Sequence, residues 1–342
     1  MASIDQDTLS YNLSGALIFC AYVISALILS VYIISSLTSR YLHPSRASQD
    51  GEIGNHKYLL IFSAFAALSF STLSYHMLNY LIVSYQIWAV GRGYEVPQRL
   101  LGENGILALE KSIPLRIWQW LTTSTLFQDF AQTICGNSAH FWWTQQALFV
   151  TMACSVFMSF EGRRRKMPNL WAYALISQIL PVSFGQNLFY LGILLTPIPM
   201  PNEIIWGPTP FLQNRNLATY FGFVFLAPYA AGTRALIPVV LVIRLLICCP
   251  LVLQMYVPGG WGWDYLNIRD RSTAYIRSFR IIGACAVILF FFQTAVALSD
   301  HGPGEILGSI NDSPAVSALG YDYLLSLVSA FTWVNLVGSD LD

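Results

Sequence analysis

A series of long apolar runs limits this chain to very few folds. Seven runs are long enough to cross a bilayer as helices, which takes about 20 residues each. They cover residues 16–37, 57–81, 140–160, 170–195, 235–256, 279–299 and 315–337. Only 11% of the 342 residues are charged, against about 25% in a soluble globular protein. The sequence therefore predicts an all-α, multi-pass membrane bundle.

Two further segments leave the number of membrane spans open. Residues 113–134 are long enough but carry Gln119, Gln128 and Asp129, whereas residues 217–230 are short and typical of a re-entrant or interfacial piece. If only 113–134 crosses, eight spans place 11 Lys and Arg on one side and 5 on the other, with both termini cytosolic. Seven spans with the N terminus outside give the same 11-to-5 distribution of Lys and Arg, and nine spans give equal numbers on the two sides. Eight is the preferred count, with seven to nine possible.

The chain is predicted to form a single domain. Residues 16–337 are the transmembrane unit, between a short polar segment, 1–15, and a short tail, 338–342. The first apolar run lacks a basic start and is too long for a cleaved signal peptide, so it is expected to be an anchor helix. Residues 82–112 are expected to form the longest polar loop, and the Pro-rich stretch 196–210 a second loop.

Several kinds of chemistry are excluded by the residues that the chain lacks. The five His residues are too far apart in sequence for a di-iron desaturase, and a haem held by His76 and His140 has only weak support. No DDxxD cluster is present to hold Mg²⁺ on a diphosphate. The net charge is zero, which argues against nucleic-acid binding. We expect neither metal nor cofactor.

Three ionisable residues lie within predicted spans, where they are rare and suspected of function. They are Asp129, Arg244 and Asp322. A carboxyl group removed from water favours its protonated form and can then serve as a general acid. The alternative is that Arg244 and one aspartate form a buried ion pair that only fixes helix packing. Asp322 is the first candidate acid, followed by Asp129 and then by Glu161, whose basic neighbours are more typical of ion pairing.

Aromatic residues accompany the candidate acids. Trp142 and Trp143 follow the Asp129 segment, and Tyr321 and Tyr323 flank Asp322. Aromatic faces attract cations and suit a pocket that holds a carbocation, although an aromatic belt at the membrane interface explains many such residues.

We count these four aromatic residues as candidate substrate-binding residues. Asn187 and Arg244 complete the set. Asp129 and Asp322 are expected to approach one cavity from two helices.

Three stretches of the sequence carry a resemblance to a known family. They are LFQDFAQTICGNSAHFWWTQQALF (126–149), SFEGRRRKMPNLWAYALISQILPVSFGQNLFYL (159–191) and SALGYDYLLS (317–326). The chain resembles the integral-membrane terpene cyclases of fungal meroterpenoid biosynthesis, of the ascochlorin, ascofuranone and macrophorin type, from about residue 57 onward.

The resemblance implies that a farnesyl chain on an aromatic head is cyclised. The reaction would begin by protonation of an epoxide or alkene, without metal or loss of diphosphate. It also implies a multi-pass protein of the endoplasmic reticulum with a hydrophobic prenylated substrate. The resemblance assigns no catalytic residue, so the candidate residues rest on the physical argument alone.

Two other functional classes remain open from the sequence. One is a transporter or channel for a small hydrophobic metabolite, although the absence of internal repeats argues against common transporter folds. The other is a seven-helix receptor or scaffold, which the number of spans would distinguish. The sequence sets neither the ring product nor the oligomeric state.

Overall fold

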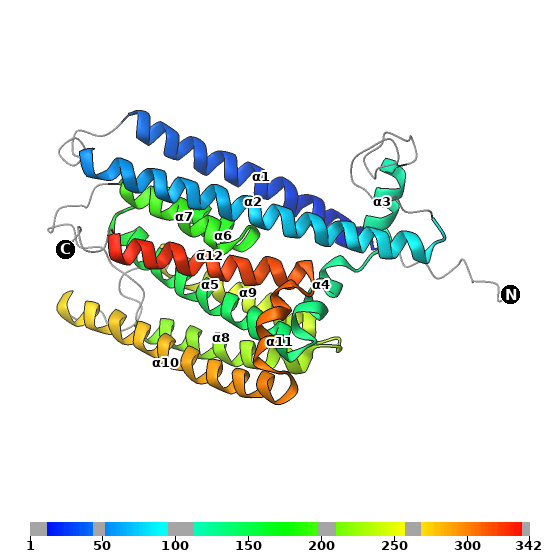
Figure 1. The fold of residues 1–342 in the computed structure, drawn as a ribbon. Coiled ribbons are helices and arrows are strands. Elements are labelled where there is room, and N and C mark those ends of the chain that lie inside the picture. Colours follow the sequence, from blue (N-terminus) through cyan, green and yellow to red (C-terminus); the bar gives the residue numbers. More distant parts are fainter. Residues whose placement is uncertain (1–11, 44–51, 95–112, 197–209, 257–267, 337–342) are drawn as a thin grey trace.

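The computed structural model describes residues 12–43, 52–94, 113–196, 210–256 and 268–336, and all of their regular structure is helical (Figure 1). The helices are α1 (Leu13–Leu42), α2 (Glu52–Gly91), α3 (Ile113–Thr123), α4 (Leu126–Cys135), α5 (Ser138–Arg164), α6 (Leu170–Ile179), α7 (Val182–Leu194), α8 (Pro210–Ala230), α9 (Leu236–Tyr256), α10 (Ile268–Asp300), α11 (Pro303–Gly308) and α12 (Pro314–Leu336). A short 3-10 helix, Ser309–Asn311, joins α11 to α12. The all-α prediction is confirmed.

Four of the described helices are long and apolar enough to cross a membrane. They contain the segments Leu13–Leu42, His56–Gly91, Arg280–Asp300 and Pro314–Leu336. Large aliphatic side chains point outward along them, as on α1 at Leu27, Ile28 and Val31. Such outward faces suit contact with lipid, and the bundle is that of a membrane protein.

Helices α6 and α7 form a hairpin that reaches halfway into the bundle and returns. With 10 and 13 residues they are about 15 and 20 Å long, shorter than the roughly 30 Å of a bilayer core. Both outer ends of the hairpin meet the end of α5, since Arg165 donates a hydrogen bond to the carbonyl oxygen of Ile193 near the end of α7. The tip meets Asp322 within α12. The predicted single span 170–195 is therefore wrong.

Pro181 explains the break. Proline has no backbone N–H and clashes with the preceding helical turn, and it pushes the residue before it into an extended conformation. Leu180 is indeed extended, with φ −107° and ψ 178°. Gly185 then allows close packing of the two helices, because a Cβ at this position would overlap the hydroxyl of Ser177.

The predicted span 113–134 is also wrong, because it divides into α3 and α4 at Ser124 and Thr125. The hydroxyl groups of Thr122 and Thr123 donate to carbonyl oxygens of the preceding turn, at Trp118 and Gln119. Such bonds compete with the backbone hydrogen bonds of a continuing helix. The segment therefore supplies two short helices at one end of the bundle instead of a crossing (Figure 1).

Two other boundaries differ from the prediction. Residues 217–230 belong to the 21-residue helix α8, because the helix begins at Pro210 and includes the polar stretch before the apolar run. The first part of the predicted loop 82–112 is helical, since α2 continues to Gly91. The rest of that loop from residue 95, the Pro-rich loop over 197–209, the first 11 residues and the tail 338–342 lie outside the described residues.

Seven of the described helices have 21 residues or more, namely α1, α2, α5, α8, α9, α10 and α12. The start of α1 lies beside α3, where the N–H of Asn12 donates to the carbonyl oxygen of Thr122 at 2.6 Å. The end of α12 lies at the other end of the bundle, where Trp333 stacks on Tyr190 of α7. We infer seven crossings, with the start of α1 and the end of α12 at opposite ends of the bundle (Figure 1). This count is within the predicted range, but it replaces the preferred eight.

Positive charge is concentrated at one end of the bundle. We call this the arginine-rich end, where α1 ends and α10 begins. In the described part of the chain its Lys and Arg residues are Arg40, Lys57, Arg163, Arg164, Arg165, Lys166, Arg215, Arg269, Arg271, Arg277 and Arg280. The opposite end, where α11 lies, has Arg92, Arg116 and Arg234. By the positive-inside rule the arginine-rich end is cytosolic.

The seven-crossing arrangement can be tested with two engineered cysteines. Arg164→Cys lies at the arginine-rich end, and Arg92→Cys at the opposite end. In sealed microsomes with the cytosolic face outward, an impermeant maleimide should label Arg164→Cys at once and Arg92→Cys only after detergent is added. Eight spans would place both positions in the cytosol, so immediate labelling of both would contradict the arrangement.

Candidate functional site

Helix α7 is buried along almost its whole length, and its polar side chains face α12. The side-chain amide of Gln186 donates to the hydroxyl of Tyr190 at 2.8 Å and accepts a hydrogen bond from Ser326. The amide of Asn187 donates to Ser329 Oγ at 3.0 Å. These bonds join α7 to α12 inside the bundle. Asn187, a candidate substrate-binding residue in the sequence, therefore ties the two helices together.

Asp322 caps the N terminus of α7. Its Oδ2 accepts the backbone N–H of Val182 and its Oδ1 that of Ser183, both at 2.9 Å. These groups belong to the first helical turn, whose N–H groups have no partner inside the helix. The carboxyl group also brings negative charge to the positive end of the helix dipole. Because both of its oxygens accept these bonds, Asp322 fixes the hairpin tip.

Arg165 occupies the other end of the same helix. Its guanidinium donates to the carbonyl oxygens of Ile193 and Thr196, both at 3.3 Å, and its Nε lies 2.6 Å from Glu161 Oε1. Only 4% of the Arg165 side chain and 8% of the Glu161 side chain are exposed. Glu161 thus pairs with the cation that caps α7, and Arg164 contacts it from outside at 2.8 Å.

The end of α6 has its own partners. The hydroxyl of Tyr22 on α1 donates to the carbonyl oxygen of Ile179 at 2.5 Å, and Nη1 of Arg244 on α9 lies 3.4 Å from that of Gln178. Arg244 therefore does not form the alternative ion pair with Asp322, since each contacts backbone groups of a different half-helix. With Asp322 of α12, these contacts place polar side chains from three helices around the tip of the hairpin.

Asp129 lies apart from this layer. It is exposed in the first turn of α4, where both carboxylate oxygens lie 3.0 Å from the hydroxyl of Thr125. Asp129 and Asp322 have separate partners and do not contact each other. The break between α3 and α4 has removed Asp129 from the interior of a spanning helix, which was the basis for grouping the two acids.

The aromatic candidates form two separate groups. Trp143 packs edge-on against Trp142, with ring centres 4.9 Å apart, and against Tyr323 at 6.5 Å. Tyr321 instead stacks on His76 of α2, with ring centres 5.1 Å apart. Consecutive helical residues point about 100° apart, so the tyrosines beside Asp322 in sequence face other helices.

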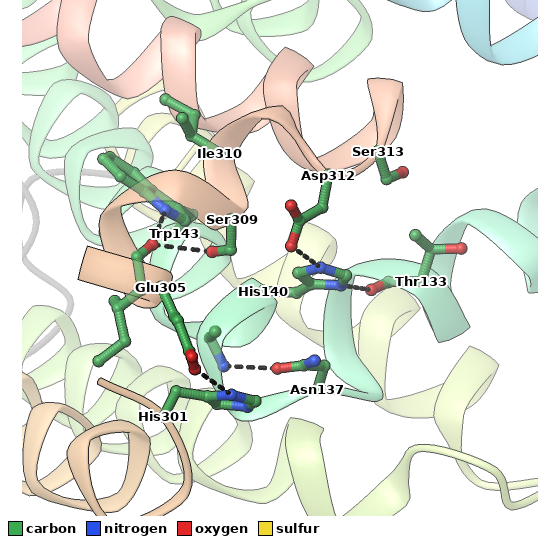
Figure 2. A network of polar contacts seen from close by, with 12 residues as sticks. Thr133, Asn137, His140, Trp143, His301, Glu305, Ser309, Ile310, Asp312 and Ser313 are labelled. Carbon is green, nitrogen blue, oxygen red and sulfur yellow. Dashed lines mark hydrogen bonds and ion pairs between the residues drawn. The ribbon is translucent and has the colours of Figure 1, made fainter. Parts of the chain in front are cut away.

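A further group of polar residues gathers near α11, at the opposite end from the arginine-rich end (Figure 2). Nδ1 of His140 lies 3.0 Å from the carbonyl oxygen of Thr133, and Nε2 lies 3.4 Å from Oδ2 of Asp312. A carbonyl and a carboxylate are both acceptors, so an imidazole with an N–H on each ring nitrogen would satisfy both contacts. The protonation is assigned from these partners. The pair is therefore suited to hold a transferable proton.

Sequence reasoning missed this pair. His140 and Asp312 are 172 positions apart, and no local pattern links them. The same end carries a second contact of this kind, between His301 and Glu305 at 3.6 Å, which Figure 2 shows beside the first.

The described residues contain no group of three or more His, Cys, Asp or Glu side chains that could hold a metal ion. The two histidines once considered for haem have other neighbours, since His76 stacks on Tyr321 and His140 contacts Asp312. Burial raises the pKa of Cys135, at the end of α4, to about 12, so this thiol stays protonated at neutral pH and is a poor ligand.

Comparison with known proteins gives one match. Residues 114–192 match a family described as a protein of unknown function, DUF2834. This stretch is less than a quarter of the chain, and it runs from α3 through most of α7. It therefore includes His140 and nearly all of the hairpin. No curated protein and no solved structure matches the chain.

The cap at α7 predicts a specific loss of stability. Asp322→Asn removes the negative charge and turns an amide N–H₂ toward one of the two backbone donors. Hydrogen bonds to a charged group contribute about 1.5–3 kcal/mol, so the folded yield and the melting temperature in detergent should both fall. Asp129→Asn is the matched control, because that carboxylate is exposed. Equal melting temperatures for the two variants would contradict the role of Asp322 as a cap.

Proposed function

We propose that this protein is a membrane terpene cyclase that closes rings in the farnesyl chain of a prenylated aromatic compound. The proposal is carried by the position of the three stretches that resemble such cyclases. Residues 126–149, 159–191 and 317–326 form α4 to α7 and the first half of α12, and these helices pack against one another. The resemblance therefore belongs to one connected region of the bundle.

The His140–Asp312 pair is the proposed proton donor. The proton passes from Nε2 of His140 to the oxygen of a terminal epoxide, the C–O bond opens, and the chain alkenes attack the carbocation in turn. Loss of a proton from the last cation gives a product with the same mass as the substrate. A positioned general acid contributes about 10²–10⁴-fold to the rate of such a step.

The aromatic side chains on α5 and α12 have a part in the same scheme. Trp143 lies one helical turn from His140, and it contacts both Trp142 and Tyr323. Aromatic faces stabilise nearby cations, which suits the intermediates. In this scheme Asp322 positions α7 and is not the acid, because its oxygens accept backbone hydrogen bonds. We place the protein in the endoplasmic reticulum, where a prenylated substrate can enter from the lipid.

A transporter of a small hydrophobic metabolite is the second candidate, and the break between α6 and α7 favours it. Many transporters bind their substrate where a helix is interrupted in the middle of the membrane. In this chain Asp322 already occupies the N terminus of α7. That cap leaves fewer backbone donors for a substrate, so we rank this candidate second.

Turnover in microsomes separates the two candidates. Microsomes that contain the protein should convert a farnesylated phenol epoxide into an isomer of equal mass, seen by mass spectrometry and NMR, and microsomes without it should not. Conversion should survive EDTA, because a proton starts the reaction. Uptake of the unchanged compound without conversion would favour the transporter, and activity lost in EDTA and restored by Mg²⁺ would contradict the mechanism.

The proton donor can be tested with a matched pair of histidine variants. His140→Gln keeps a polar side chain of similar reach but cannot hold the transferable proton, so turnover should fall about 10²–10⁴-fold. His301→Gln changes the other histidine at the same end and should keep turnover near the wild-type rate. Both variants should fold, as judged by size-exclusion chromatography. Full activity in His140→Gln would rule out this donor.

A further inference from the structure

Arg244 is an exposed cation in the middle of a membrane helix. It is the ninth residue of the 21-residue helix α9, about 12 Å from the start of that helix. Leu241 and Leu245 are 58% and 68% exposed and occupy the neighbouring surface of α9. The guanidinium therefore lies on a face that is otherwise suited to lipid. Such a position is costly for a charge and is a default sign of function.

Within the described residues, protein groups use little of the hydrogen-bonding capacity of this guanidinium. It can donate five hydrogen bonds, and its one contact within the described residues is the 3.4 Å approach of Nη1 to the carbonyl oxygen of Gln178. That contact draws the side chain toward the tip of the hairpin. The guanidinium is thus held at a depth between the two ends of the bundle and does not extend toward the membrane surface.

The groups around Arg244 have their acceptors and donors engaged elsewhere. The hydroxyl of Tyr22 donates to Ile179, and that of Tyr220 donates to the carbonyl oxygen of Leu148. The carboxyl of Asp322 accepts the N–H groups at the start of α7. Within the described structure, no carboxylate lies within ion-pair distance of Arg244. The carboxyl of Asp322 acts on Arg244 only at longer range, so the carboxylate of a ligand would supply a direct hydrogen-bonded partner.

We propose that Arg244 binds the anionic head of an amphiphile that enters from the lipid beside α9. An aryl carboxylate fits best, because the planar guanidinium fork pairs with a carboxylate through two parallel hydrogen bonds. An anionic phospholipid offers similar chemistry, but its head is anchored at the membrane surface, about 12 Å from this depth. We therefore assign the site to a prenylated aryl acid. The guanidinium fork sets the carboxylate, whereas the aryl head that carries it and the prenyl tail rest on the proposed function.

Binding can be measured without turnover. The probes are a farnesylated hydroxybenzoate and its neutral methyl ester, and the protein is held in phosphatidylcholine nanodiscs. Arg244→Gln should weaken binding of the acid about 10–100-fold, the loss expected for charged hydrogen bonds, and leave binding of the ester unchanged. Arg215→Gln, at the arginine-rich end, should bind both probes as the wild type does. Binding of the ester also reports that each variant is folded.

The outcomes separate the possibilities. Equal binding of the acid by wild type and Arg244→Gln would overturn the proposal. If phosphatidic acid added to the nanodiscs is retained by the wild type and lost in Arg244→Gln, while the acid probe binds both equally, the occupant is a phospholipid and the assignment to an aryl acid fails. If Arg244→Gln loses binding of both probes, Arg244→Lys is measured next. This variant keeps the positive charge but lacks the guanidinium fork, so the proposal expects it to bind the ester normally and the acid weakly. If the wild-type protein binds the acid through Arg244 but never converts it, the proposed cyclase function fails and the proposed binding site stands.

Discussion

The structure depends on how a buried helix that ends inside the bundle satisfies its own backbone. The first N–H and last C=O groups of a helix have no partner within it, and lipid offers none. In α7 the carboxyl of Asp322 accepts the first N–H groups and the guanidinium of Arg165 donates to the last carbonyl oxygens. An anion at the N terminus and a cation at the C terminus also oppose the helix dipole. These two side chains therefore help to hold the hairpin at half depth.

The hairpin in turn sets the topology. Because α6 and α7 return to the end from which they came, the stretch 170–195 contributes no crossing, and in the inferred seven-crossing arrangement the 21-residue α8 contributes one. The start of α1 and the end of α12 then lie at opposite ends of the bundle, and the described Lys and Arg residues collect at one end. Pro181 breaks the helix locally, and the hairpin that forms there, capped by Asp322 and Arg165, lets α8 begin at the arginine-rich end.

Charged groups that looked equivalent in the sequence have different tasks in the fold. Asp322 and the Glu161–Arg165 pair hold α7, and at the surface Asp129 accepts a hydrogen bond from the hydroxyl of Thr125. The His140–Asp312 contact lies near α11, beside the Trp143 cluster. Arg244 lies partway along α9 on its exposed side, and within the described residues its guanidinium makes one hydrogen bond, to the carbonyl oxygen of Gln178. In our proposals Asp322 and the Glu161–Arg165 pair position the helices. His140 with Asp312 gives a proton, and Arg244 holds the head of the substrate.

By itself, the sequence determined that the chain is an all-helical membrane bundle, because runs of about 20 apolar residues with few charges allow no other solution. It also identified Asp322 and Arg244 as unusual, because charges within such runs are costly. It could not give their roles: hydropathy counts residues along one segment, whereas the partner of Asp322 is a helix terminus some 140 positions away, and that of His140 is 172 positions away. Only the tertiary structure decided which apolar stretches form long helices, which acid acts as a cap and which carboxylate lies beside His140, because each depends on backbone and side-chain groups brought together by packing.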